Sequence, residues 1–147
     1  MLSNSCKYAI RAIIYLALKE ENNKRIGIKE IATELDIPSP FLGKILQILA
    51  KNKILKSIKG PNGGFYFAKR PNEITLLSII EIIDGLDFLN NCLIGLRSCS
   101  ANNNYDMQCP LHEKYEPISK QIYELFSSET IESIKLKIIT SGETIAL

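Results

Sequence analysis

Tryptophan is absent from this chain of 147 residues, and histidine occurs once. Long apolar runs are absent as well. A helix that crosses a bilayer needs roughly 20 apolar residues, whereas the apolar stretch at residues 10–18 is shorter and contains Arg11. That stretch also lacks the small-residue cleavage site of a secretory signal. We therefore predict a cytoplasmic protein with no membrane segment.

Residues arranged for catalysis are also lacking. The sequence has no phosphate-binding glycine loop ahead of a predicted helix and no credible pair of nucleophile and base. Its one histidine, His112, stands close to three cysteines in the sequence. A role shared with these cysteines accounts for it better than a catalytic role does. We therefore expect that the protein is not an enzyme.

The charged residues are unevenly distributed along the chain. Residues 1–70 contain 13 Lys and Arg against 5 Asp and Glu, and residues 71–147 contain 5 against 11. The net charges are therefore +8 and −6, which add to the +2 of the whole chain. A basic half is typical of a protein that binds a polyanion such as nucleic acid. A solvated surface with uneven charge would produce the same counts.

Hydrophobic spacing predicts three helices in the first third of the chain. The first begins at Ser3 or Ser5 and runs to about Glu20, and the second covers residues 28–35. Ser39 followed by proline is typical of a helix start. The third helix has an inward stripe of Leu42, Ile45, Leu46 and Leu49 and an outward face of Gly43, Lys44, Gln47 and Lys51. Two short helices joined by a tight turn form a helix-turn-helix pattern.

A β-hairpin is predicted directly after this pair of helices, at about residues 54–68. Residues 54–58 are β-prone, residues 59–64 read Lys-Gly-Pro-Asn-Gly-Gly, and residues 65–68 form the second strand. A helix-turn-helix followed by a glycine-rich hairpin is typical of a winged helix, because glycines allow close approach to phosphates. The alternative is an ordinary hairpin whose Lys-rich edge prevents sheet aggregation.

The rest of the chain is predicted to be mainly helical. Thr75 caps a helix that runs to about Asp84. A loop then leads to a longer amphipathic helix at about residues 112–126, of a kind that small domains use to dimerise, and Ser128 caps a last short helix. The predicted fold is therefore mainly α with a small β-hairpin. We divide it into a winged helix-turn-helix DNA-binding domain (1–85), a cysteine-containing sensor loop (86–111) and a dimerisation helix with the C-terminal segment (112–147).

Three of the four cysteines cluster in the predicted loop, and the histidine follows them. Cys92, Cys99, Cys109 and His112 lie within 21 positions. Thiolates and imidazole suit both zinc and iron–sulfur clusters, and the spacing does not choose between these groups. The alternative is three small buried hydrophobic residues and one surface histidine. Cys6 lies far away in the first helix, where we expect a packing role.

With these residues in view, the chain resembles the Rrf-two family of bacterial transcription regulators, which includes the iron–sulfur cluster regulator and the nitric-oxide-sensing repressor. The resemblance runs from about Leu2 to Ile134. It is carried by KYAIRA at 7–12, IKEIA at 28–32, KGPNGGF at 59–65, ITL at 74–76, and the three cysteines with CPLH at 109–112.

The resemblance implies a homodimer that binds a pseudo-palindromic operator in double-stranded DNA. In such a dimer the third helix enters the major groove and the wing contacts the backbone or the minor groove. The residues implied to face DNA are Ser39, Phe41, Lys44 and Gln47 on the helix, and Lys59, Asn62 and Gly63 on the wing.

The resemblance also implies an iron–sulfur cluster of the 2Fe–2S type, held by Cys92, Cys99, Cys109 and His112. Some relatives use a carboxylate near the N-terminus in place of the histidine. Lys7 stands at about that position here, which favours His112. Two alternatives stay open: a cluster-free regulator of the same fold controlled by thiol oxidation or a partner protein, and a zinc-stabilised protein-interaction module.

Overall fold

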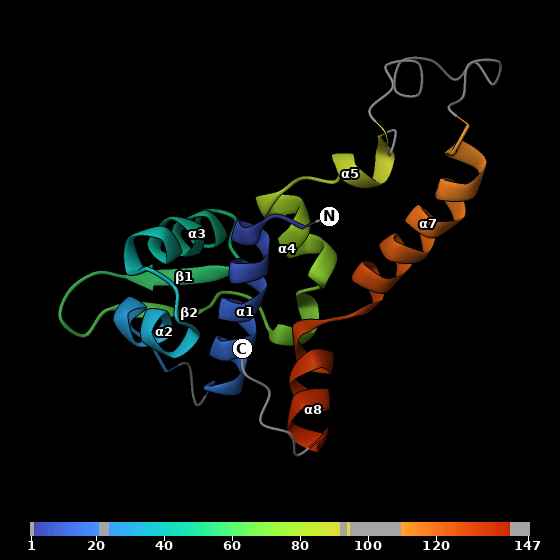
Figure 1. The fold of residues 1–147 in the computed structure, drawn as a ribbon. Coiled ribbons are helices and arrows are strands. Elements are labelled where there is room, and N and C mark those ends of the chain that lie inside the picture. Colours follow the sequence, from blue (N-terminus) through green and yellow to red (C-terminus); the bar gives the residue numbers. More distant parts are fainter. Residues whose placement is uncertain (1, 21–23, 92–93, 95–109, 142–147) are drawn as a thin grey trace.

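The structure is a computed structural model that describes residues 2–20, 24–91, 94 and 110–141. It consists of helices around a two-stranded antiparallel hairpin, as the sequence predicted (Figure 1). In chain order the elements are α1 (Asn4–Leu18), α2 (Ile28–Leu35), α3 (Ser39–Lys51), β1 (Leu55–Ile58), β2 (Gly64–Phe67), the 3-10 helix η1 (Pro71–Glu73), α4 (Leu76–Ile83), α5 (Asp87–Asn90), α7 (His112–Ser128) and α8 (Ile131–Ser141).

Helix α1 forms the centre of the hydrophobic core. The side chain of Ser3 caps it by accepting a hydrogen bond from the backbone N–H of Cys6. Eight of its residues are buried because it packs against α2, α3, α4 and α8. The prediction of a first helix from Ser3 or Ser5 to about Glu20 is therefore confirmed, with its end at Leu18.

Helices α2 and α3 pack together as the helix-turn-helix pattern predicted. The inward stripe of α3 is buried in full, and Asp36 ends α2 in the left-handed conformation with φ 52°. Gly43 does not point outward as predicted. A Cβ at this position would lie 3.0 Å from Cδ1 of Ile28, so the missing side chain lets α3 approach α2 closely.

The cap of α3 also differs from the prediction. Pro38 is the N-cap, and Ser39 is the first helical residue. Within the described residues no side chain caps this end, and the backbone carbonyl of Pro38 accepts from the N–H groups of Phe41 and Leu42 at 3.0 Å. Pro40, the second helical residue, has no backbone N–H, so one fewer N–H group at this end needs a partner.

The C-terminal helices leave the core and return to it. Helix α7 packs against α4 and α5 and extends as an arm, whereas α8 lies beside α1 (Figure 1). Ile131 of α8 is fully buried, and its N–H donates to the Ile74 carbonyl at 2.9 Å. The predicted cap at Ser128 is wrong. Ser128 ends α7, and the Thr130 hydroxyl accepts from the Ser133 N–H at 3.1 Å instead.

Candidate nucleic-acid interface and sensor segment

The outer face of α3 carries the helix residues that were predicted to face DNA. Phe41, Lys44 and Gln47 are exposed, and Ser39 is half-buried at the start of the helix. The apolar stripe of the same helix is buried against the core, which fixes the direction in which the polar face points. This face therefore presents one ammonium and one amide group in a rigid frame, and both suit contacts with base edges or phosphates.

The side chain of Phe41 is exposed, but it also contacts α1. Its ring meets the ring of Tyr8 edge to face, with centroids 5.8 Å apart. The Arg11 guanidinium lies 5.8 Å from the centre of the Tyr8 ring and donates to the carbonyl of Leu35 at 2.7 Å. This chain of contacts joins α1 to the turn between α2 and α3. It therefore fixes the start of α3 relative to the core.

The wing is an antiparallel hairpin with a third backbone segment beside it. Leu55 pairs with Phe67 and Ile58 with Gly64. Ile26, outside the named strands, exchanges two backbone hydrogen bonds with Phe65, at 2.9 and 3.0 Å. These bonds tie β2, at its end next to the tip turn, to the segment ahead of α2, so the wing and the helix-turn-helix form one unit.

The tip of the wing requires glycine at two positions. Gly60 has φ 108°, in the region that other residues rarely adopt. A Cβ at Gly63 would lie 2.2 Å from the carbonyl oxygen of Ile58, so no larger residue fits the turn as it stands. The turn leaves Lys59 and Asn62 exposed and Gly63 half-buried. The three predicted wing residues therefore share the tip of the hairpin.

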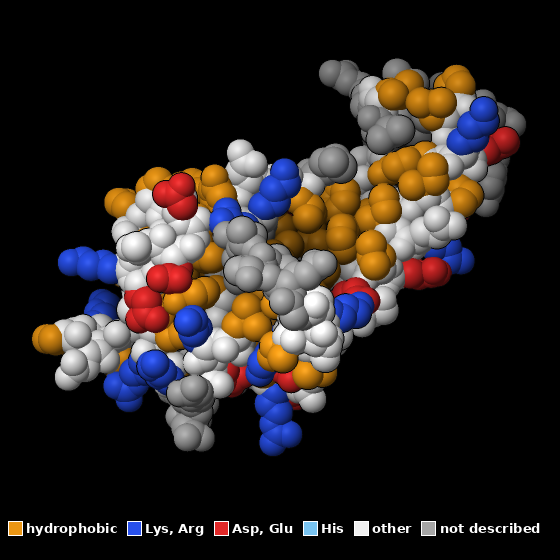
Figure 2. All heavy atoms as spheres, turned by 60° about the horizontal axis from the view of Figure 1, so that its bottom comes forward, with side chains coloured by type: hydrophobic (Ala, Val, Ile, Leu, Met, Phe, Trp, Pro, Cys, Tyr) orange, Lys and Arg blue, Asp and Glu red, His pale blue; other side chains and the backbone are white. Residues whose placement is uncertain are grey.

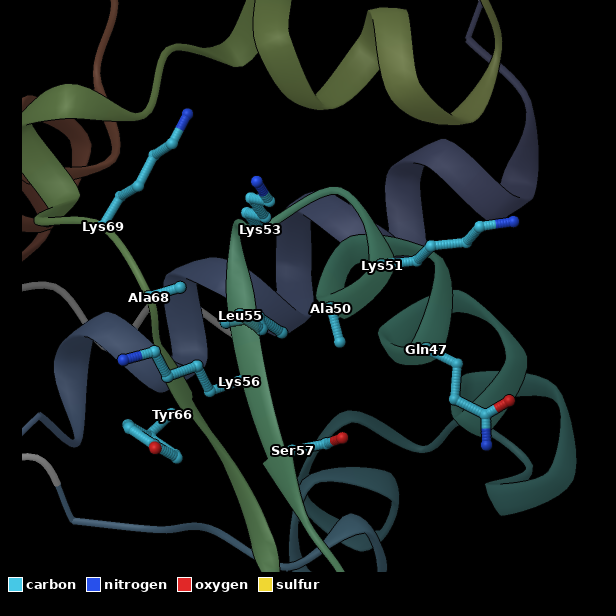
Figure 3. Close-up of a pocket in the computed structure, with 10 residues that line it drawn as sticks. All are labelled: Gln47, Ala50, Lys51, Lys53, Leu55, Lys56, Ser57, Tyr66, Ala68 and Lys69. Carbon is cyan, nitrogen blue, oxygen red and sulfur yellow. The ribbon is translucent and has the colours of Figure 1, made fainter.

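The structure adds a set of lysines to those predicted. An open groove of about 740 Å³ lies between the outer side of α3 and the hairpin (Figure 3). Lysines 51, 53, 56 and 69 line it together with Gln47. Lys51 follows Lys44 by seven residues, a helical spacing that places both on one face, and this signal was readable in the sequence. The position of Lys53 depends on its backbone φ of 60°, and the sequence did not indicate that conformation.

The predicted sensor segment lies largely outside the described residues. Cys92, Cys99 and Cys109 are in that part, and the described residues contain no cluster of three or more metal-binding side chains. His112 is the first residue of α7 and is partly exposed. Its Nε2 lies 3.8 Å from the carboxylate of Glu116, one turn along the helix.

The two elements that flank this segment are joined by side-chain hydrogen bonds. The Tyr115 hydroxyl donates to the carbonyl of Phe88 at 2.8 Å, and the buried Ser119 hydroxyl donates to the carbonyl of Leu89 at 2.6 Å. We call these two bonds the α5–α7 clasp. The described residues on either side of this segment therefore stand on one joined pair of helices.

Cys6 is separated from the other cysteines by burial. Its side chain is fully buried in α1. Burial, followed by the charge of Asp84, raises the pKa of the Cys6 thiol from 9.0 to about 12. A thiol held protonated in this way is a poor nucleophile and a poor metal ligand, because both roles need the thiolate. The predicted packing role of Cys6 is confirmed.

A helix-turn-helix with a wing, an exposed polar recognition face and a lysine-lined groove define a winged-helix DNA-binding protein. Comparison with known families then gives the particular group. Residues 2–135 match the family model Rrf2, which is described as an iron-dependent transcriptional regulator. The chain belongs to the Rrf2 family, and it is a DNA-binding transcription regulator of that type.

Individual relatives agree with this assignment. A helix-turn-helix-type transcriptional regulator of Aquifex aeolicus is 36% identical over 134 residues, which cover 91% of this chain and 90% of the relative. The regulator NsrR of Geobacillus kaustophilus is 37% identical over 116 residues, which cover 78% of each chain. The structure of CymR, the global cysteine regulator of B. subtilis, has the same fold: its TM-score is 0.75 at 22% identity, covering 93% of this chain and 97% of CymR.

Among the described residues, no helix combines the length and the apolar character needed to cross a membrane.

Proposed function

We propose that this regulator binds a pseudo-palindromic DNA operator as a homodimer and senses iron–sulfur status, redox conditions or nitric oxide through a 2Fe–2S cluster. The cluster ligands in this proposal are Cys92, Cys99, Cys109 and His112. The observation that carries the sensing proposal is the α5–α7 clasp. It joins both ends of the cysteine segment to the helix on which His112 stands.

The DNA contacts in the proposal come from α3 and the wing. Ser39, Phe41, Lys44 and Gln47 would enter the major groove, and Lys59, Asn62 and Gly63 would contact the backbone or the minor groove. Support comes from the exposure of the polar side chains on one face of α3 and from the backbone pairing that joins the wing to the segment ahead of α2. The lysines around this face suit the negative charge of DNA.

The residues present fit an iron–sulfur cluster by their chemistry. Thiolates and imidazole are cluster ligands, and His112 is partly exposed and lies just after Cys109 in the sequence. The Glu116 carboxylate beside Nε2 can orient the ring, as carboxylates near metal-bound histidines do. When bound, such a cluster would supply a group that changes with oxygen, iron supply or nitric oxide.

The clasp gives the ligand segment a route to the rest of the molecule. A cluster bound by Cys92, just after α5, and by His112, at the start of α7, would hold these two helices in one arrangement. Loss of the cluster would release them. Helix α7 also packs against α4, and α4 packs against α1 and α3. In a dimer, a small rotation of α7 would therefore change the spacing of the two recognition helices and the operator affinity.

The dimer in the proposal forms through α7. Ile118, Tyr123 and Leu125 are exposed on this helix although they are apolar or aromatic. Figure 2 shows apolar side chains gathered where the arm leaves the rest of the molecule. A second copy of the chain would cover this surface, because exposed apolar patches of this kind mark interfaces.

Metal analysis after purification without oxygen tests the sensing proposal. We expect about two irons and two acid-labile sulfides per chain and a red-brown colour, all lost in a Cys92→Ala variant together with the operator response. Unchanged metal content and an unchanged operator response in that variant would contradict the proposal.

Two other results would favour the alternatives. Zinc without sulfide would support a structural zinc site, and DNA binding without a steep salt dependence would then support a protein-interaction module. A colourless, metal-free protein that still binds its operator would support control by thiol oxidation or by a partner protein.

A further inference from the structure

Two adjoining hollows, which we together call the crevice, lie beside β1 on the side of α3. The groove of about 740 Å³ described above forms one part of it, and a second hollow of about 470 Å³ lies toward the wing tip. Gln47 of α3 and Ser57 of β1 line both hollows. The crevice therefore follows β1 from the base of the hairpin to its tip. Helix α3 forms the opposite wall of the first hollow, and Gln47 of α3 together with residues 27–29 forms that of the second.

Lysines form the rim of the wider part of this crevice. Figure 3 shows Lys51 on the α3 side, Lys56 across the hairpin beside Tyr66, and Lys53 and Lys69 extending toward the same end. Among the residues that the structure describes, no Asp or Glu lines this part. Within the described part of the chain none of these four lysines forms an ion pair, since the ion pairs there lie on α7, α8 and the Glu129 turn between them.

The floor of the groove is apolar, which distinguishes it from a simple patch of surface charge. Ala50 of α3, Leu55 of β1 and Ala68 after β2 line it. A charged rim over a floor of small or buried apolar side chains fits a ligand that has both charged groups and less polar groups along its length. A sugar–phosphate strand is such a ligand, because each charged phosphate is followed by a less polar deoxyribose.

The proposed binding mode brings such a strand to the crevice. If α3 lies in the major groove and the wing reaches the adjacent minor groove, the strand between the two grooves must pass between α3 and the hairpin. The length of α3 agrees with this arrangement. Lys51 is seven residues beyond Lys44, or about 10 Å along the axis, and the major groove is about 12 Å wide. A helix with Lys44 among the base edges therefore places Lys51 near the bounding strand.

We propose that the crevice between α3 and β1 is a binding track for one phosphodiester strand of the operator, with Lys51, Lys53, Lys56 and Lys69 contacting its phosphates. This inference rests on the proposed function of α3 and the wing. DNA is favoured over an acidic protein segment because the crevice is continuous with the predicted base-reading face through Gln47. These lysines strengthen binding to every sequence alike, whereas Lys44 and Gln47 set the preference among sequences.

The test is the salt dependence of DNA binding by the full chain. The variant Lys51→Gln/Lys53→Asn/Lys69→Gln removes three charges, and asparagine is chosen at position 53 because it tolerates the left-handed backbone there. The probe is a labelled duplex of mixed sequence, about 30 base pairs or roughly three turns long. The slope of log affinity against log salt should become shallower by about 0.9 for each phosphate that a lysine no longer neutralises, or by about 2.7 in total.

The matched control is Lys120→Gln/Lys135→Gln/Lys137→Gln, which removes three charges from α7 and α8. A slope shallower than that of the control by more than about 1 supports the track. Any smaller difference overturns it, provided that both variants unfold at the wild-type temperature or are compared in affinity per folded molecule.

A second comparison separates the track from the proposed function. The variant Lys44→Ala/Gln47→Ala should change the ranking of different duplexes, whereas the three-lysine variant should weaken binding to all of them equally. Suppose that DNA binding by the wild-type chain depends steeply on salt, but the three-lysine variant has the same salt slope as its control. That result would overturn the track and leave the proposed function standing. Absence of duplex binding by the wild-type chain would overturn the track and the proposed function together.

Discussion

Burial determines the chemistry of Cys6. The thiol is buried within reach of the charge of Asp84, and Asp84 also accepts from the backbone N–H of Ser3 at 2.8 Å. Water is excluded from the thiol and a carboxylate is nearby, so the neutral form is favoured. Cys6 is therefore chemically quiet in the folded chain.

Alkaline pH should destabilise the protein through Cys6. The pKa of the thiol is about 12 in the folded chain and 9.0 when exposed. Between these values the folded chain keeps a proton that the unfolded chain loses, so stability falls as pH rises from about 9 toward 12. Below pH 9 this thiol contributes no pH dependence. At pH 10 we expect a loss of about 1 kcal/mol in the free energy of unfolding relative to pH 8.

Denaturant unfolding under reducing conditions measures this effect, with Cys6→Ala as the comparison. The variant is less stable at both pH values because it leaves a small cavity, but it lacks the part of the pH dependence that comes from the thiol. An equal loss between pH 8 and pH 10 in wild type and variant would contradict the assignment. Tyr15, whose pKa burial and nearby glutamates raise to about 12, contributes equally to both chains.

At the scale of elements, the clasp is the contact on which the sensing proposal depends. Helix α5 has only four residues, Asp87–Asn90. So short a helix is not stable by itself. Its place is held by the hydroxyls of Tyr115 and Ser119 and by burial of Leu89. We therefore expect α5 to respond to single changes on α7.

The substitution Ser119→Ala tests the clasp. It removes the donor of a buried 2.6 Å hydrogen bond and leaves the Leu89 carbonyl without that partner. We expect a loss of about 1–2 kcal/mol, seen as faster amide hydrogen exchange in α5 and in the first turns of α7. Cluster retention in air should fall as well, because the ligand segment would no longer start and end on joined helices.

Ser127→Ala is the matched control on the same helix. The Ser127 hydroxyl donates to the carbonyl of Glu124 in its own helix, at 3.1 Å and in contact with solvent. Its loss should change stability by no more than about 0.5 kcal/mol. Equal hydrogen exchange in the two variants would show that the clasp does not hold α5.

At the scale of the whole molecule, the arm formed by α7 has apolar surface that one copy of the chain does not cover. Ile118 and Leu125 are 52% and 54% exposed. They are seven residues apart and so lie on one face of the helix. A dimer that pairs this face would also fix the distance between two recognition helices, which binding to a pseudo-palindromic operator requires.

The double substitution Ile118→Glu/Leu125→Glu should give a folded monomer. Both side chains are exposed in the single chain, so the core is untouched, but charges would be buried without partners in a dimer. Sedimentation velocity measures the change in mass. Operator affinity should fall with it, because a monomer binds only one half-site.

Leu136→Glu/Ile139→Glu provides a control of the same chemistry. These two side chains of α8 are 52% and 58% exposed, and α8 lies beside α1 rather than on the arm. This variant should remain a dimer. A wild-type monomer, or a monomer from the α8 variant alone, would move the interface away from α7.

Local sequence signals predicted the elements well because their causes are local. The third helix and the wing are specified by Pro40, by the apolar stripe of α3 and by the glycines at 60 and 63, and each acts within a few residues. Caps were predicted less well. Ser39 and Ser128 were predicted as caps, but Pro38 and Thr130 occupy the cap positions. Several residues near each helix start are acceptable caps, and tertiary contacts select one of them.

The sequence by itself determined the winged helix-turn-helix, the basic first half and the family of this protein, because periodicity, turn residues and net charge are properties of neighbouring positions. Only the tertiary structure decided which distant segments meet. It placed Ile131 in the core beside α1, joined Ser119 to Leu89 across 30 positions, and brought Lys51 and Lys69 to the rim of one groove. Such contacts depend on how all the helices pack at once, and no single stretch of sequence specifies that.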